Sequence, residues 1–283
     1  MVSTAHRASR DPLGLVSVPG MDPSALVGHT FGPHPFRICV ENVADFVAVT
    51  GDDGERWVKA APPGFVAAAL FVVAPELLSR FTDRSVLHGE QTFTWHRALT
   101  VETDLEVSGT VSRVRERGGV NFVNFDLVVD GTDGEVAAGS AMFLVSGDSN
   151  VVTGVEEAPE PSPNDRGNPA PGQVSASRAD LVRYAAATRD WNPIHWDHDA
   201  AVGAGVSGVV VHGLLQASWA FVEASRLRNG ERPLREARVR FRSPLPPARP
   251  ATISVEEAEG TATVIIGDSQ TEFINARIEF SDE

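Results

Sequence analysis

Apolar and polar positions in the second half of the chain predict two helices followed by several strands. Apolar residues recur at helical spacing over residues 181–188, and Ser177 and Asp180 have the spacing of a capping box that would open this short helix. Residues 209–226 are apolar on nearly all sides, which predicts a long helix that neighbouring elements must surround.

The segments after the long helix have the period of two that is typical of strands. In "REARVRFRS", Val239 and Phe241 share one face, whereas Arg238, Arg240 and Arg242 share the other. The segments "ATISVEEAE", "TATVIIG" and "EFINARIEF" continue as strands between Gly and Asp turns. A buried helix against a curved antiparallel sheet is an α+β architecture.

The first half of the chain repeats this order of elements. "DFVAVTGDDGERW" resembles "RYAAATRDWNPIH" at an offset of 138 residues, and "GFVAAALFVVAPELLSRF" resembles "GVVVHGLLQASWAFVEAS" at an offset of 144 residues. This diverged duplication predicts two units, each a long helix wrapped by a sheet, an arrangement that looks like a double hot-dog fold. Such a fusion builds a hot-dog dimer into one polypeptide.

Composition sets the expected limits of the two units. Residues 147–171 are rich in Pro, Gly and acidic side chains, which predicts a linker between residues 21–146 and residues 172–283. Residues 1–20 are expected to form a disordered N-terminus.

Charge and cysteine content exclude several classes of protein. The formal net charge of −14 argues against broad nucleic-acid binding, which requires a basic surface. Cys39 is the single cysteine, so neither an intramolecular disulfide nor a cysteine-rich zinc site can form, and a reducing cytoplasm is the expected compartment. We find no unbroken apolar run of membrane-spanning or signal-peptide length, so we expect no membrane association.

The stretch "RDWNPIH" is the strongest candidate for chemistry. Pro193 disfavours helix at Asn192 and forces an extended turn between Asp190 and His195. Such a turn can bring the carboxylate and the imidazole to the same water, where they would form a general acid–base pair. On spacing alone, a structural turn with a hydrogen-bonded histidine is an equally good explanation.

The neighbouring stretch "VVVHGLL" suggests how a reacting oxygen could be held. Without a Cβ, Gly213 lets its N–H approach a ligand oxygen, and a nearby helix N-terminus favours a developing oxyanion. Close helix–sheet packing is the alternative explanation for this glycine. For His212 we expect a structural role, as a buried side chain bonded to a carbonyl.

The sequence contains two other groups of residues that could bind a ligand. His195, Asp197 and His198 could be read as a metal cluster, but no second cluster completes a ligand set, so we expect no metal. Arg238, Arg240 and Arg242 could grip phosphates of coenzyme A or a pantetheine arm, although a solvated strand face is the simpler explanation.

Residues 184–215 resemble the hydratase motif of the MaoC-like dehydratases and (R)-specific enoyl-CoA hydratases. The motif reads Y-A-x-x-[ST]-x-D-x-N-P-[IL]-H-x-D and then [IV]-x-H-G-[ML]. It is matched here by Tyr184, Thr188, Asp190, Asn192, Pro193, His195, Asp197, His212 and Gly213. Arg189 departs from the pattern, because a glycine is common at its position.

The resemblance implies a hot-dog fold and a hydro-lyase of fatty-acid or related acyl metabolism. Its reaction would be reversible addition of water to a trans-2-enoyl thioester, giving an (R)-3-hydroxyacyl thioester. Asp190 and His195 would be the catalytic pair, Asn192 would support their geometry, and the Gly213 N–H would bind the thioester carbonyl. The substrate would be an acyl-CoA or acyl-carrier-protein thioester, and no cofactor is implied. The chain would be a pseudo-dimer that could also form a homodimer or pair with another subunit.

The first half lacks half of this motif. Asp52 corresponds to Asp190, but Trp57 replaces His195, and "AAL" replaces "HGL" in the long helix. We therefore expect no chemistry there, and we expect Trp57→Ala to alter chain-length preference. A hot-dog acyl thioesterase and a non-catalytic acyl-binding partner subunit are the alternative functions.

Overall fold

The computed structural model describes residues 21–82, 84–147 and 157–282. The predicted disordered N-terminus, residues 1–20, therefore lies outside the described residues, as does part of the predicted linker.

The first half contains two α-helices and seven strands. In chain order its elements are η1 (Pro23–Leu26), β1 (Thr30–Arg37), α1 (Val40–Thr50), β2 (Ala60–Ala61), η2 (Pro63–Val66), α2 (Ala67–Leu78), η3 (Ser79–Phe81), β3 (Ser85–Trp95), β4 (Leu99–Thr100), β5 (Asp104–Arg117), β6 (Val120–Gly131) and β7 (Gly134–Ser146).

The second half repeats the order of a short helix, a long helix and then strands. Its elements are β8 (Gln173–Val174), α3 (Arg178–Thr188), η4 (Pro193–His195), α4 (His198–Gly203), α5 (Gly213–Ser225), β9 (Leu234–Phe241), β10 (Ala251–Ala258), β11 (Thr261–Gly267) and β12 (Glu272–Phe280).

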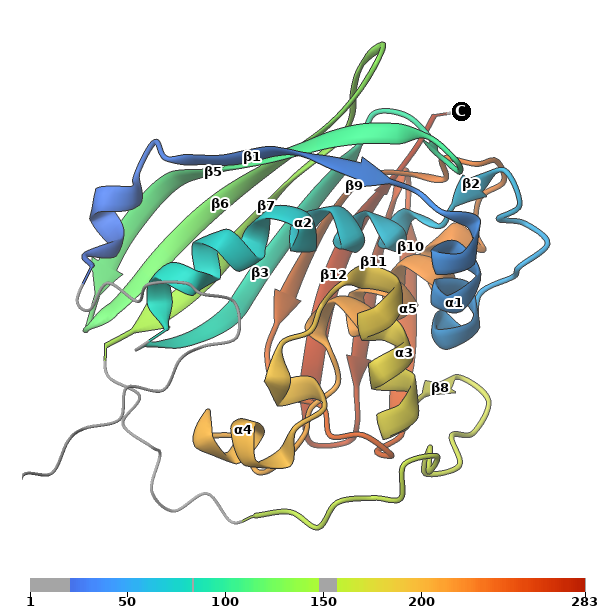
Figure 1. Cartoon of the computed structure of the whole chain (residues 1–283). Helices are drawn as coiled ribbons and strands as arrows, with labels where there is room; N and C mark the ends of the chain where they lie inside the picture. The colour runs from blue at the N-terminus through green and yellow to red at the C-terminus, as the bar shows by residue number, and fades with distance from the viewer. Residues whose placement is uncertain (1–20, 83, 148–156, 283) are drawn as a thin grey trace, which may run out of the picture.

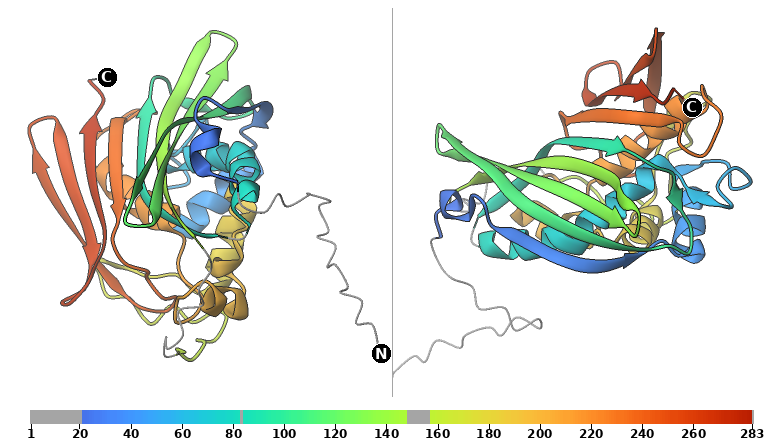
Figure 2. Two further views of the ribbon diagram at one scale, coloured as in Figure 1. Left: turned by 90° about the vertical axis from the view of Figure 1, so that its left-hand side faces the viewer. Right: turned by 90° about the horizontal axis from the view of Figure 1, so that it is seen from above.

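One antiparallel sheet runs through both halves. Its ten strands lie in the order β1-β5-β6-β7-β3-β9-β12-β11-β10-β8. The halves meet where β3 pairs with β9, with Glu90 opposite Arg240 and Thr94 opposite Glu236. The sheet curves around the helices, which gather on its inner side (Figures 1 and 2). The predicted α+β architecture is thus confirmed.

The core is shared between the halves. The buried apolar side chains form one continuous cluster that includes residues of both. Phe221 of α5 packs edge-on against Trp95 of β3, with 5.5 Å between ring centroids. Phe46 of α1 meets Tyr184 of α3 at 5.8 Å, and these two residues correspond to each other at the 138-residue offset. The two halves therefore contact each other through equivalent residues, as the two subunits of a symmetric dimer do.

The long helix of the second half begins later than the sequence predicted. We expected a helix from about residue 209, but α5 begins at Gly213. The Val210 N–H instead donates to Ile194 O (3.2 Å), and the Val211 N–H donates to Leu245 O (2.8 Å). Three successive β-branched valines favour this extended backbone, because their side chains crowd the preceding turn of a helix.

The helical segment Pro63–Phe81 has the length and hydropathy of a membrane span, although Glu76 and Arg80 interrupt its apolar residues. However, 61% of its 18-residue window is buried within the protein. It contains α2, which lies against the inner side of the sheet (Figure 1), so its apolar character has an explanation in core packing.

The division into two units with a linker stays a prediction. Strand β7 ends at Ser146 and β8 begins at Gln173, and the described part of the connection packs onto the second half. There Arg166 forms two hydrogen bonds with the buried carboxylate of Asp180, at 2.7 and 2.6 Å.

We expect residues 172–283 alone to self-associate rather than persist as a folded monomer. Removing the first half would expose the edge of β9 and the face of Phe221. Exposed strand edges and apolar faces tend to associate with other chains. Size-exclusion chromatography with circular dichroism would detect this, and co-expression with residues 21–146 should restore a single folded species. A monodisperse, folded monomer of residues 172–283 would contradict the shared core.

Candidate active site

Helix α3 delivers the first candidate residue. Its N-terminus carries the predicted capping box, in which the Asp180 N–H donates to Ser177 Oγ and the Ser177 N–H donates to Asp180 Oδ2. The helix ends at Thr188, and its C-cap residue, Arg189, has a left-handed backbone (φ 67°). The chain therefore turns sharply one residue before Asp190, and the Asp190 side chain enters the interior, where the residue is 5% exposed.

The turn after Asp190 has the geometry that its proline and asparagine predict. The Asn192 N–H donates to Asp190 Oδ1 (3.4 Å), and Asn192 Oδ1 accepts from the Ile194 N–H (3.4 Å). Pro193 occupies the first position of η4, where its missing N–H is not needed. The Asn192 side chain therefore caps the turn that presents His195, which is a structural basis for its expected supporting role.

Hydrogen bonding selects one tautomer of His195. Its Nδ1 lies 2.8 Å from Val210 O. A carbonyl oxygen can only accept, so Nδ1 carries the proton and Nε2 presents a lone pair. This is the form of imidazole that can act as a general base.

Burial shifts the pKa values of Asp190 and His195 in opposite directions. Burial raises the pKa of Asp190 to about 7, opposed by the hydrogen bond from the Asn192 N–H. Burial lowers the pKa of His195 to about 4, opposed by the hydrogen bond to Val210. Near neutral pH the histidine is therefore uncharged, while the carboxyl group is partly protonated. The pair thus holds a proton acceptor beside a proton donor.

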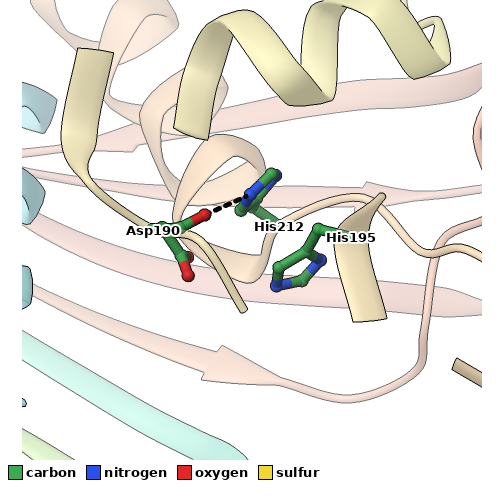
Figure 3. Close-up of side chains that lie close together, drawn as sticks. All are labelled: Asp190, His195 and His212. Atoms are coloured by element: carbon green, nitrogen blue, oxygen red, sulfur yellow. Dashed lines mark hydrogen bonds between the residues drawn. The ribbon is translucent and has the colours of Figure 1, made fainter. Parts of the chain in front are cut away.

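His212 joins this pair, which the sequence did not lead us to expect. It precedes α5 as its N-cap residue, and its ring stacks on His195 with centroids 3.8 Å apart and planes 25° apart. Its Nε2 lies 3.2 Å from Asp190 O, so it bonds a carbonyl as predicted, yet that carbonyl belongs to a candidate catalytic residue. Figure 3 shows the three side chains gathered at one place. His212 therefore holds the Asp190 backbone and one face of His195 together.

Gly213 is the first residue of α5, directly after this cluster. An N–H in the first turn of a helix has no acceptor within the helix, so it is available to a ligand. A Cβ at Gly213 would lie 3.0 Å from two carbons of the Phe241 ring, so close packing also demands a glycine. Both explanations offered by the sequence are compatible here, and the oxyanion role stays a prediction.

The residues of the cluster are types that could hold a metal ion. Asp190, His195 and His212 offer ligand atoms that all lie within 4.8 Å of one another. However, the two imidazole rings are stacked 3.8 Å apart, so their lone pairs lie in separate, nearly parallel planes, which does not favour convergence on one ion. We therefore assign the cluster to acid–base chemistry.

Asp197 and His198, weighed from the sequence as metal ligands with His195, have other partners among the described residues. Asp197 Oδ1 accepts from the Ala200 N–H and caps α4, whereas His198 contacts Glu157 at 2.7 Å and Glu160 at 3.3 Å. These contacts fasten the connection between the halves to α4.

The arginines of β9 and Arg242, which directly follows the strand, form ion pairs with exposed or partly exposed glutamates. Arg238 and Arg240 lie 2.8 and 3.1 Å from Glu90, and Arg242 lies 3.5 Å from Glu272. The solvated strand face is therefore the better account of these residues.

The corresponding place in the first half contains a structural substitute for the acid–base pair. The Trp57 indole N–H donates to Asp52 Oδ2 (2.8 Å), and Trp57 is 3% exposed. Arg56, stacked over Trp57, donates to the carbonyl of Ser225 (2.7 Å) at the last residue of α5. A helix of this length spans about 20 Å, so Trp57 lies far from Gly213. These contacts give Trp57 a structural role, and its expected influence on chain-length preference stays a prediction.

Family models match both halves of the chain. Residues 162–272 match the MaoC like domain, and residues 25–139 match the FAS1-like dehydratase domain region. The second half of the chain is a MaoC-like dehydratase domain, and the first half is a FAS1-like dehydratase region. The MaoC like domain contains Asp190, His195 and His212, whereas the matched region of the first half contains Asp52 and Trp57.

Relatives and solved structures agree with this assignment. A relative of this chain, the 3-hydroxyacyl-thioester dehydratase X of Mycobacterium tuberculosis, is 28% identical over 226 residues, which are 77% of this chain and 76% of the relative. The crystal structure of HtdX from M. tuberculosis superposes with a TM-score of 0.72 and 21% identity over 89% of this chain and all of that one. A conserved M. tuberculosis protein described as a double hotdog fold has a TM-score of 0.59 and 12% identity, over 90% of this chain and 96% of that one. The predicted double hot-dog fold is confirmed.

We expect His212→Phe to lower kcat roughly tenfold with little change in KM. Phenylalanine keeps a ring against His195 but leaves the buried Asp190 carbonyl without its donor, which costs about 1–3 kcal/mol and loosens the carboxyl group. His212→Ala should cost more, because it also leaves a cavity. Steady-state kinetics and denaturant unfolding would measure both effects, with His96→Ala, at an exposed histidine, as control. Unchanged kcat in His212→Phe would contradict this role.

Proposed function

We propose that this protein catalyses reversible hydration of a trans-2-enoyl thioester to an (R)-3-hydroxyacyl thioester. The observation that carries the proposal is the buried pair formed by Asp190 and His195. Its proton donor and proton acceptor share one site, with the first turn of α5 beginning one residue after His212.

The protonation states of Asp190 and His195 suggest which group gives a proton and which group takes one. In hydration, His195 Nε2 takes a proton from water as the water oxygen forms a bond to C3 of the enoyl group. Electrons move to the thioester oxygen, where the Gly213 N–H stabilises the enolate. The protonated carboxyl group of Asp190 then gives its proton to C2. A proton passing from His195 to Asp190 restores the starting state.

Dehydration uses the same groups in the reverse order. Ionised Asp190 removes the proton from C2, and protonated His195 gives a proton to the departing hydroxyl group. Because one cluster serves both carbons, water adds to, and leaves from, one face of the double bond. This geometry supports formation of a single stereoisomer.

The alternative functions have less support. A hot-dog thioesterase would place its carboxylate on the long helix or on a strand, but the one carboxylate of α5 is Glu223, near its C-terminal end and paired with Arg226. A non-catalytic subunit would not need a buried carboxyl group at a cost in stability. For the site itself we propose no cofactor.

Location and assembly are also proposals. A cytoplasmic location is supported by the single free cysteine, Cys39. The substrate is proposed to be an acyl-CoA or an acyl-carrier-protein thioester. The double hot-dog fold already supplies a pseudo-dimer, which could associate further with itself or with another subunit.

We expect Asp190→Asn and His195→Ala each to reduce hydration of crotonyl-CoA roughly a thousandfold. Each variant lacks one of the two groups that must move a proton, and general acid or base catalysis contributes about this much. Loss of enoyl absorbance measures the rate, and assay of released thiol separates hydration from thioester cleavage. Near-normal turnover in both variants would overturn the proposal, as would thiol release by the unmodified protein.

We also expect Asp190→Asn to stabilise the protein above pH 7. The pKa of Asp190 is raised from 3.8 to about 7 in the folded state, so stability falls as pH rises between these values. The full penalty, on the order of 4 kcal/mol, applies above pH 7. Asparagine cannot ionise, so the variant should gain most at pH 8 and less than half as much at pH 5 in urea unfolding. An equal difference between variant and wild type at both pH values would contradict the raised pKa.

A further inference from the structure

Arg189 occupies a backbone position that suits glycine. Its φ and ψ are 67° and 14° at the C-terminal end of α3. Gly51, which corresponds to it at the 138-residue offset, has φ 70° and ψ 27° at the end of α1. The two halves thus use the same left-handed turn, but only the half with the acid–base pair carries a side chain there. A residue with a Cβ is strained in this conformation, and such strain gathers at functional sites.

Arg189 is exposed and directly precedes the buried Asp190 in the chain. Asp190 faces the interior, while its neighbours Arg189 and Trp191 are exposed, Trp191 by 50%. Trp196 is 42% exposed and donates its indole N–H to Trp191 O (3.3 Å). Two indoles and a guanidinium therefore belong to the turn that presents the catalytic pair.

The Arg189 guanidinium has no ion-pair or hydrogen-bond partner among the described residues, unlike nearby cations. Arg178 pairs with Glu160 at 2.6 Å, and Arg183 lies 3.7 Å from Asp180. The helix C-terminus gives Arg189 a favourable field, which is a purely structural explanation. That explanation does not account for the preference over glycine, which would relieve the strain.

We propose that Arg189 binds the phosphate group of the substrate's phosphopantetheine arm, on the exposed turn that also carries the indole of Trp191. The inference rests on the proposed function, and it adds a binding residue to that site. A chain with a net charge of −14 repels an anionic substrate, so a local guanidinium at the site is needed to hold phosphate. Coenzyme A and carrier-bound phosphopantetheine share this phosphate chemistry.

The test compares thioesters with and without phosphate. We expect Arg189→Gly to raise KM for crotonyl-CoA about tenfold, the effect of losing one charge-assisted hydrogen bond at an exposed site. The same variant should leave kcat and KM for crotonyl-pantetheine, which lacks phosphate, unchanged. Arg189→Lys should restore most of the affinity for crotonyl-CoA. Crotonyl-phosphopantetheine shows whether the phosphate of the arm suffices or the nucleotide phosphates of coenzyme A are required.

The thermal stability of Arg189→Gly and a substitution at a second exposed arginine provide the controls. Arg189→Gly should keep or raise Tm, because relief of the left-handed strain offsets the added chain entropy. Arg277→Gln, at an exposed arginine of β12, should leave both substrates unaffected. An equal KM for crotonyl-CoA in Arg189→Gly and wild type would overturn the inference, as would an equal rise for both thioesters. If wild-type protein hydrates neither thioester, the proposed function itself fails.

Discussion

Removal of a carboxyl group and an imidazole from water is the constraint on which the site depends. Desolvation disfavours the charged form of each group, so it raises the pKa of Asp190 and lowers that of His195. In water the two would exist as a carboxylate and a partly protonated imidazole; in the protein they become a donor and an acceptor of protons. Burial is possible because the sheet and the helices of both halves exclude solvent from the N-terminal end of α5.

The site is held by contacts that do not involve reacting atoms. The Val210 carbonyl sets the tautomer of His195, and the Asn192 side chain caps the turn between the pair. His212 contacts both members, through the Asp190 carbonyl and through the face of His195. Positioning from several elements fixes the pair more firmly than a loop alone can, which is what proton transfer over a short distance requires.

The two halves of the duplicated chain have different roles at equivalent positions. In the first half, the Trp57 indole takes the place of the imidazole and donates to Asp52, so this half-buried carboxylate has a hydrogen-bond donor. Arg56 then joins this region to the end of α5. The first half thus supplies β3, Trp95 and Phe46 to a core that neither half completes alone, while the second half retains the acid–base pair.

The sequence by itself determined the class of fold, the duplication, the capped helix α3 and the pairing of Asp190 with His195. These features are local: periodicity, a capping box, and a proline turn act over a few residues. Tertiary structure decided the rest. The backbone of residues 209–212 is extended because Ile194 and Leu245 provide its hydrogen-bond acceptors, and both are distant in sequence. His212 meets His195 for the same reason. The pKa of each reacting group depends on burial, which is a property of the whole packed molecule and not of its neighbours in the chain.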